Sequence, residues 1–93
     1  MEISKLVIPG VAVSKMRSGG KEVYYVYIPQ RFNKYLSHGK WNITVIVDDK
    51  EIPIGFRSVF RHGTYFIVTL PINLRYLWEE YLGKEIDLVL EKF

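Results

Sequence analysis

Basic residues gather around two turn-like stretches that contain glycine, and they are the side chains best suited to bind a ligand. They are Lys15, Arg17 and Lys21 at the first turn, and Arg57, Arg61 and His62 at the second. Arginine can hold a phosphate through two parallel hydrogen bonds or read the edge of a guanine base. We expect nucleic-acid contacts led by Arg17 and Arg61, with Lys15, Lys21 and Arg57 adding nonspecific attraction. The alternative is that these residues only keep two polar turns soluble.

Two further groups of residues are secondary candidates. Arg31 and Arg75 lie on the expected polar faces of two short helices. Tyr25 and Tyr27 alternate with apolar residues, so both should face away from the core. They are expected to pack on a second face of the barrel or in a dimer contact, and the alternative is that they stack on bases.

Catalysis has little support in the sequence. The chain has no cysteine, and its two histidines, His38 and His62, show no metal-ligand spacing. It contains no nucleophile-elbow, phosphate-loop or dinucleotide-binding motif. The adjacent acids Asp48–Asp49 and Glu79–Glu80 are expected to be solvated surface. We therefore predict no enzyme, no catalytic residue, no metal site and no cofactor. A barrel with a small-ligand pocket is the remaining alternative.

Composition limits the chain to one domain, residues 1–93. Hydrophobic residues make up 48% of it, which is enough for a core. It has neither an apolar run long enough to span a bilayer nor a signal-peptide pattern, so no membrane contact and a cytoplasmic location are expected. Residues 1–78 carry 11 Lys/Arg and 5 Asp/Glu, whereas residues 79–93 carry 2 and 5. The excess of positive charge in residues 1–78 favours anionic partners. Few Asn and Gln and no Cys are typical of a thermophile.

The chain contains an internal repeat, residues 6–48 and 51–91. Val7–Gly19 aligns with Glu51–Gly63 at an offset of 44, with an Ile-Pro pair and a later Arg and Gly in common. Gly20 and Lys21 have no counterpart, and the offset then falls to 42. The alignment therefore predicts that the copies differ in length at the hairpin turn, where insertions are tolerated.

Each copy has the pattern of strand, strand, helix, strand. The first strands are expected over Leu6–Met16 and Ile52–Phe60, and short helices should follow Pro29 and Pro71. Apolar alternation marks the inward faces of the other strands. These positions are Tyr24, Val26, Ile28, Ile43, Val45 and Val47 in one copy and Phe66, Val68, Leu70, Ile86, Leu88 and Leu90 in the other. We expect Trp41 and Trp78 to pack in the core or against a helix. The predicted fold is mainly β with two short helices: a six-stranded barrel with pseudo-two-fold symmetry, built from a duplicated ββαβ unit.

The second copy resembles the AbrB/SpoVT swapped-hairpin family. Leu70–Pro71, Leu74, Arg75 and Leu77 match the family pattern of a strand ending in an apolar residue and proline, followed by a helix with Leu and Arg. In the first copy Ile28–Pro29 fits, but Asn33 stands where the family has arginine. The duplicated architecture is also similar to the cradle-loop barrels, which include double-psi and RIFT barrels.

This resemblance implies a small DNA-binding protein, a transcriptional regulator or an antitoxin-like partner. Members of the AbrB-like family build the barrel from two chains, whereas this chain would supply both units. The alternative is a protein-interaction or oligomerisation module without nucleic-acid binding. In that case an apolar face of Tyr25, Tyr27, Tyr65 and Ile67, with the acidic C-terminal tail, would dock a second copy or another protein.

Overall fold

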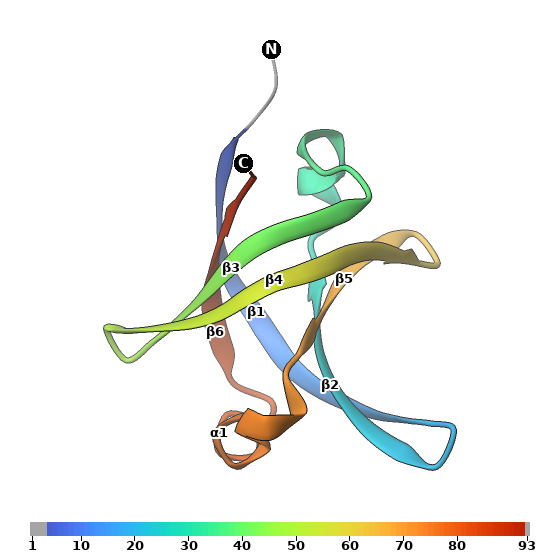
Figure 1. Cartoon of the computed structure of the whole chain (residues 1–93), viewed down its shortest axis with the longest axis vertical. Coiled ribbons are helices and arrows are strands. Elements are labelled where there is room, and N and C mark those ends of the chain that lie inside the picture. Colours follow the sequence, from blue (N-terminus) through green and yellow to red (C-terminus); the bar gives the residue numbers. More distant parts are fainter. Residues whose placement is uncertain (1–3, 93) are drawn as a thin grey trace.

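The computed structural model describes residues 4–92, which form a closed barrel of six strands (Figure 1). The strands are β1 (Lys5–Ser18), β2 (Lys21–Ile28), β3 (Gly39–Val47), β4 (Lys50–His62), β5 (Tyr65–Leu70) and β6 (Glu85–Glu91). The helical segments are η1 (Gln30–Tyr35), η2 (Ile72–Leu74) and α1 (Arg75–Glu80). The expected class, mainly β with short helices, is confirmed.

Neighbouring strands are antiparallel around the whole ring, whose order is β1–β2–β5–β4–β3–β6. The first part of β1 pairs with β6 and its second part with β2. In the same way, β4 pairs first with β3 and then with β5. The pairs β2–β5 and β3–β6 join the two halves of the chain. Closure gives each strand a hydrogen-bonded neighbour on both sides.

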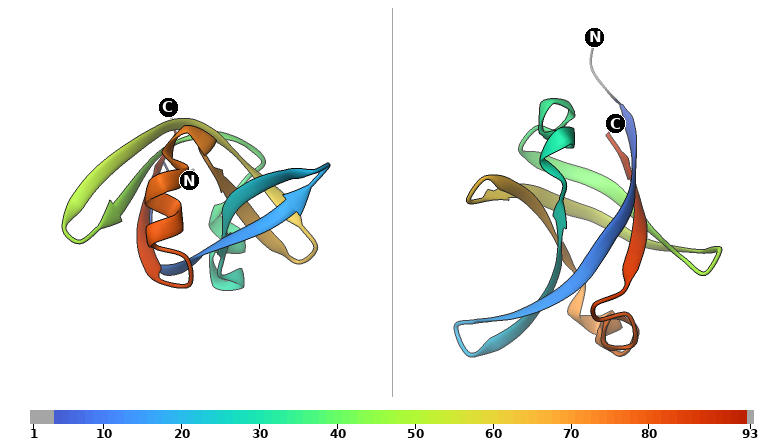
Figure 2. Two further views of the ribbon diagram at one scale, coloured as in Figure 1. Left: turned by 90° about the horizontal axis from the view of Figure 1, so that it is seen from below. Right: turned by 180° about the vertical axis from the view of Figure 1, so that it is seen from behind.

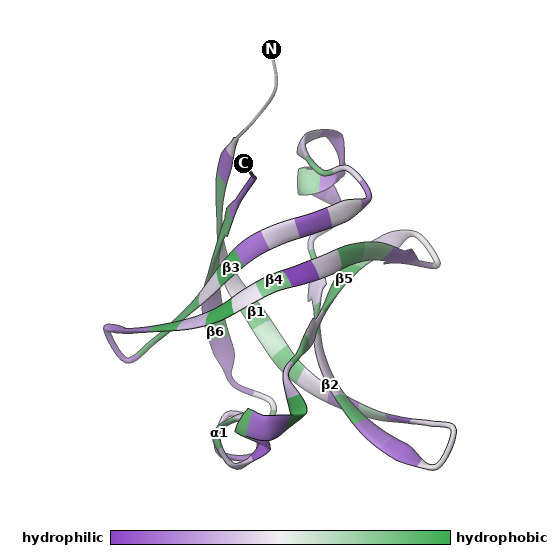
Figure 3. Cartoon of the chain, viewed as in Figure 1, coloured by the Kyte–Doolittle hydropathy of each residue, from purple (hydrophilic) through white to green (hydrophobic). Residues whose placement is uncertain are grey.

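The barrel interior is filled by the apolar residues that alternate along the strands. Each inward position predicted from the sequence is buried, and hydropathy alternates in bands along β3 and β4 (Figure 3). Ile8, Val11, Val13 and Val59 complete the strand contribution to this core. A strand with one face in a core and one face in solvent requires this period of two.

Helical segments cover opposite ends of the barrel, η1 at one end and α1 at the other (Figures 1 and 2). Trp78 of α1 is fully buried, and its indole N–H donates to the Pro71 carbonyl at 2.8 Å. Trp41 is also buried and donates to the Ser37 carbonyl at 3.3 Å. Of the two placements expected for these tryptophans, in the core or against a helix, both residues belong to the core. Within residues 4–92, no helix has the length and apolar character needed to cross a membrane.

The long strands β1 and β4 each bend at a β-bulge. The register of β1 against β6 shifts between Ile8 and Val11, and that of β4 against β3 shifts opposite Ile43 and Thr44. Gly10 and Gly55 lie at these shifts with φ of +67° and +78°. An extra residue bends a strand and increases its twist, which helps a strand pass from one partner to the next.

The hairpins β1–β2 and β4–β5 both turn through two-residue loops, because Ser18 pairs with Lys21 and His62 with Tyr65. The predicted length difference at the turn is therefore wrong. The difference in length lies in the second strand of each hairpin instead, since β2 has 8 residues and β5 has 6. Both tips project on one side of the barrel, and the β3–β4 turn projects on the other (Figures 1 and 2).

Candidate nucleic-acid interface

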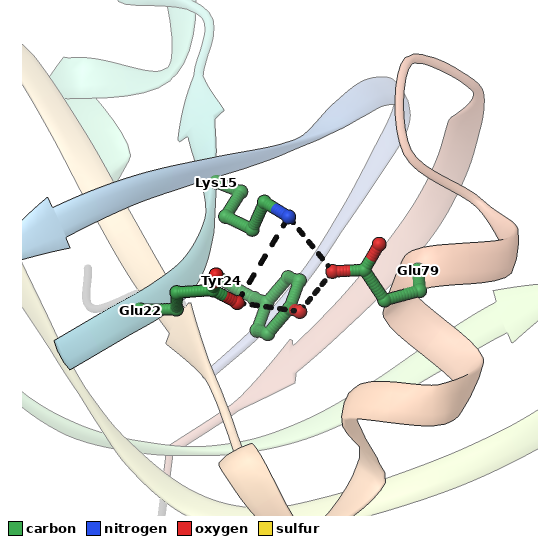
Figure 4. Close-up of polar contacts among 4 residues, drawn as sticks. All are labelled: Lys15, Glu22, Tyr24 and Glu79. Carbon is green, nitrogen blue, oxygen red and sulfur yellow. Dashed lines mark hydrogen bonds and ion pairs between the residues drawn. The ribbon is translucent and has the colours of Figure 1, made fainter.

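Lys15, near the first hairpin tip, is held by acidic side chains. Its Nζ lies 3.0 Å from Glu79 Oε2 and 3.9 Å from Glu22 Oε2 (Figure 4). The Tyr24 hydroxyl donates a hydrogen bond to the same Glu79 carboxylate. These contacts connect the β1–β2 hairpin to α1, and they balance the charge of Lys15 before any ligand binds.

These contacts shift the pKa values of the groups involved. The hydrogen bond between Tyr24 and Glu79 lowers the pKa of Glu79 and raises the pKa of Tyr24 to about 12. The contact with Glu79 also raises the pKa of Lys15. At the C-terminal end of α1, Tyr81 donates a hydrogen bond to Asp48, and this bond raises the pKa of Tyr81 to about 12.

Glu79 and Asp48 are therefore more than the solvated surface acids expected from the sequence. Both side chains are exposed, yet each accepts a hydrogen bond from a tyrosine. Their tyrosine partners are 55 and 33 residues away in the chain. The sequence analysis missed these contacts because it could not place α1 beside the β1–β2 hairpin or beside the β3–β4 turn.

Arg17 and Lys21 are the exposed cations of the first tip. Within residues 4–92, neither side chain has a hydrogen-bond or ion-pair partner. Arg17 pairs across the hairpin with Glu22, and Lys21 pairs with Ser18. Because successive strand residues point to opposite faces, the two cations lie on opposite faces of the hairpin.

The two arginines of the second hairpin have different surroundings. Arg57 donates through Nε to the Thr69 carbonyl and through Nη2 to Thr69 Oγ1, both at 3.0 Å. It is half-buried and braces β4 against β5. Arg61 is exposed, with its guanidinium carbon 5.2 Å from the centre of the Phe66 ring. A cation–π contact leaves the N–H groups of Arg61 available to a phosphate.

The helical segment η1 lies against the second tip, because Asn33 Nδ2 donates to the Thr64 carbonyl at 3.3 Å. Arg31 and Lys34 flank Asn33 in sequence and are exposed. Their charged groups lie 4.8 and 5.1 Å from the aromatic ring of the residue that follows each of them. The fold thus brings the segment that carries Arg31 and Lys34 to the hairpin tip that carries Arg61. We call these three cations the η1 corner.

Arg75, the other secondary candidate, is remote from the η1 corner. It is the first residue of α1, at the opposite end of the barrel (Figure 1). Its charge helps to lower the pKa of Glu79, which lies one helical turn further along. The structure therefore does not bring all the sequence candidates into a single site.

The η1 corner belongs to a part of the chain without carboxylates. Residues 23–47 and 52–78 contain six Lys/Arg and no Asp or Glu. The acids lie elsewhere, and the acidic turn around Asp48 and Asp49 projects on the side opposite the hairpin tips (Figure 2). Positive charge at the corner is therefore not neutralised by neighbours in sequence, and it favours an anionic ligand.

Tyr27 is the centre of an aromatic cluster beside this corner. Its ring centre lies 5.2 Å from that of Tyr25, 5.3 Å from that of Tyr65 and 6.2 Å from that of His62. The Tyr27 hydroxyl is 3.3 Å from His62 Nδ1. A groove of about 740 Å³ is lined by Tyr27, His62, Gly63, Thr64 and Tyr65. Alternation predicted the outward tyrosines, but the position of His62 depends on the pairing of β2 with β5.

Among residues 4–92, no group of three or more His, Asp or Glu side chains could hold a metal ion. Comparison with known proteins adds no relative: no protein-family model, curated protein or solved structure matches the chain.

Proposed function

We propose that the protein binds nucleic acid, with DNA as the first candidate. The phosphate contacts are made by Arg17, Lys21, Arg31, Lys34 and Arg61. These five cations are exposed, and none of them has an ion-pair partner within residues 4–92. Phosphates can therefore approach them without displacing a carboxylate.

The charge asymmetry of the chain carries this proposal. The η1 corner lies in acid-free segments, and the acidic β3–β4 turn lies on the opposite side from the hairpin tips. Electrostatic attraction supplies most of nonspecific nucleic-acid binding. Lys15 and Arg57, which hold Glu79 and Thr69, serve mainly to brace the two hairpins.

A charge-matched pair of double variants tests the site. Arg17→Ala with Arg61→Ala removes one exposed cation from each tip, and we expect affinity for DNA at low salt to fall by about tenfold or more. Lys50→Ala with Lys84→Ala removes the same net charge beside the acidic residues Glu51 and Glu85, and should cost far less. Binding is measured by fluorescence anisotropy of a labelled oligonucleotide.

Three results would count against this assignment. Equal losses in the two double variants would mean that net charge alone attracts DNA. Unchanged affinity in the arginine double variant would exclude the tips as the site. Absence of binding by the unmodified protein at low salt would exclude the function itself.

We further propose that DNA binding serves transcriptional regulation or an antitoxin-like role, through kinship with AbrB-like and other cradle-loop barrels. The support is the match of Leu70–Pro71, Leu74 and Arg75 to the family pattern, together with a barrel architecture compatible with it. Immunoprecipitation of the protein with bound DNA, followed by sequencing, tests this role. Enrichment upstream of genes is expected, and uniform coverage would contradict it.

The second candidate is a protein-interaction module. Tyr27 and Tyr65, which are 37% and 41% exposed, together with Phe60 at 36%, give the outside of the barrel an aromatic face. Exposed apolar patches of this kind often mark protein interfaces. Sedimentation across salt concentrations separates the candidates, since a stable, salt-insensitive dimer without DNA affinity would favour the interaction module.

A further inference from the structure

From Val23 onward, the outer face of β2, together with that of β5 and the end of β4, carries no Lys, Arg, Asp or Glu side chain. Its outward positions are Val23, Tyr25, Tyr27, Ser58, Phe60, His62, Tyr65, Ile67 and Thr69. Ile67 is fully buried even though it points outward, because Tyr27 and Phe60 stand opposite it on the neighbouring strands. By contrast, β6 presents Glu85, Asp87 and Glu91 on its outer face. The aromatic face is therefore a distinct surface and not a general property of the barrel.

The groove on this face has the size and chemistry of a site for a flat aromatic ligand. Its volume of about 740 Å³ falls within the ~300–1,000 Å³ of small-ligand sites. Tyr27 and Tyr65 are about two-fifths exposed, so a ligand can reach their rings. The hydroxyls of Thr64 and Tyr65 add polar groups at the rim. Nucleobases combine such flat faces with polar edges.

Tyr27 is held in place before any ligand binds. Its ring makes edge contacts with Tyr25 and Tyr65 and a stacked contact with His62, whose Nδ1 is also within hydrogen-bond distance of its hydroxyl. A side chain that is already ordered loses little entropy on binding. The cluster therefore orders Tyr27 before a base arrives.

Cations lie next to the aromatic groove. Asn33 donates to the Thr64 carbonyl in the groove wall, which places η1, the segment that carries Arg31 and Lys34, beside the groove. Arg61 is on the same hairpin, although it points to the other face, over the Phe66 ring. A stacking surface bordered by cations is the arrangement that binds single-stranded nucleic acid. A second copy of the chain on this face would bring like charges together, which disfavours self-association.

From these observations we infer that unpaired bases of a single-stranded nucleic acid stack on Tyr27 and Tyr65 while its phosphates meet Arg31 and Lys34 of η1. This inference rests on the proposed nucleic-acid function and narrows its ligand to unpaired strands. Bases in a duplex are stacked on each other and cannot offer their faces to tyrosine without being flipped out. A duplex can therefore use only the cations.

Parallel titrations of a single strand and a duplex test this inference. Fluorescence anisotropy compares a labelled oligothymidine of about 15 nucleotides with a duplex of the same length, at low salt. We expect tighter binding of the single strand. Tyr65→Ser should weaken single-strand binding about tenfold and leave duplex binding unchanged, because one stacked base is lost. Tyr76→Ser is the matched control, since Tyr76 is 71% exposed on α1 at the far end of the barrel.

The outcomes separate this inference from the function on which it rests. The inference is wrong if single strand and duplex bind with equal affinity and if Tyr65→Ser and Tyr27→Leu both keep the affinity of the unmodified protein. In that case the proposed function still stands. If neither nucleic acid binds, the proposed function itself fails. A dimer in sedimentation that Tyr65→Ser dissociates would also overturn the inference. Thermal melting of each variant shows that it remains folded, and a selective loss for the single strand in both tyrosine variants supports base stacking.

Discussion

Glu79 accepts contacts from two strands of the first hairpin, although it lies in a short helix far along the chain. Lys15 of β1 and Tyr24 of β2 both reach its carboxylate (Figure 4). The side chain is exposed, so water and salt weaken the ion pair. The main effect of the Glu79 contacts is to fix the position of α1 beside the hairpin whose tip carries Arg17 and Lys21.

The pKa of Tyr24 couples folding stability to alkaline pH. It is raised from 10.0 to about 12 by the hydrogen bond to Glu79. Between these two pH values the unfolded chain releases the tyrosine proton while the folded protein keeps it. The stabilising effect is therefore complete below pH 10 and is lost as pH rises towards 12. We expect thermal unfolding to show a smaller alkaline decrease in Tm for Tyr24→Phe than for the unmodified protein.

The control for this prediction is Tyr76→Phe, which changes an exposed tyrosine of α1 that has no hydrogen-bond partner within residues 4–92. It should follow the unmodified protein across the alkaline range. An alkaline decrease in Tm that is the same in Tyr24→Phe and the unmodified protein would show that Tyr24 does not carry the coupling.

At the scale of elements, the bulges in β1 and β4 allow two long strands to serve two partners each. Gly55 has φ of +78°, and no atom outside its chain neighbours would lie within 4 Å of an added Cβ. Gly55→Ala therefore meets no steric clash, and its cost comes from the backbone alone. We expect it to destabilise the protein by about 1–2 kcal/mol, measured by urea unfolding.

Ser58→Ala, on the same strand and also exposed, is the comparison and should change stability by less than about 0.5 kcal/mol. If Gly55→Ala is as stable as the unmodified protein, the positive φ at the bulge is not required by the fold. With either result, m-values should match between the variants, because the surface exposed on unfolding is unchanged.

Local pattern predicted the strands well and the site only in part. The faces of β2, β3, β5 and β6 followed from alternation, because a strand of period two leaves little choice of which side is buried. The contact of Asn33 with Thr64 and that of Glu79 with Lys15 join distant segments. Neither has a sequence signal, since both depend on how the barrel closes. The sequence therefore supplied Arg31 and Arg61 as candidates but could not place η1 at the tip of the second hairpin.

The segment η1 shows a second limit of local reasoning. Phe32, Tyr35 and Leu36 have helical spacing, but the chain adopts a 3₁₀ helix over Gln30–Tyr35. Its Phe32 and Leu36 amides donate to carbonyls three residues earlier. Such tight turns are common in short connections. Periodicity detects that a helical segment is present but does not distinguish the two kinds of helix at this length.

At the scale of the whole molecule, exposed positive and negative charges are concentrated on opposite sides of the barrel. The hairpin tips with Arg17 and Arg61 project on one side, and the acidic turn with Asp48 and Asp49 projects on the other (Figure 2). Such a distribution orients a protein in the field of a polyanion before contact. The tips would therefore meet nucleic acid first, and β6, with its outward carboxylates, would face away.

The dependence of nucleic-acid affinity on salt tests the central claim most directly. If the five proposed cations each neutralise one phosphate, the slope of log K against log salt concentration should be about −3 to −4 for a single strand. Equilibrium titrations of the unmodified protein over a range of salt concentrations give this slope. A slope near zero, or no measurable binding at low salt, would contradict the account.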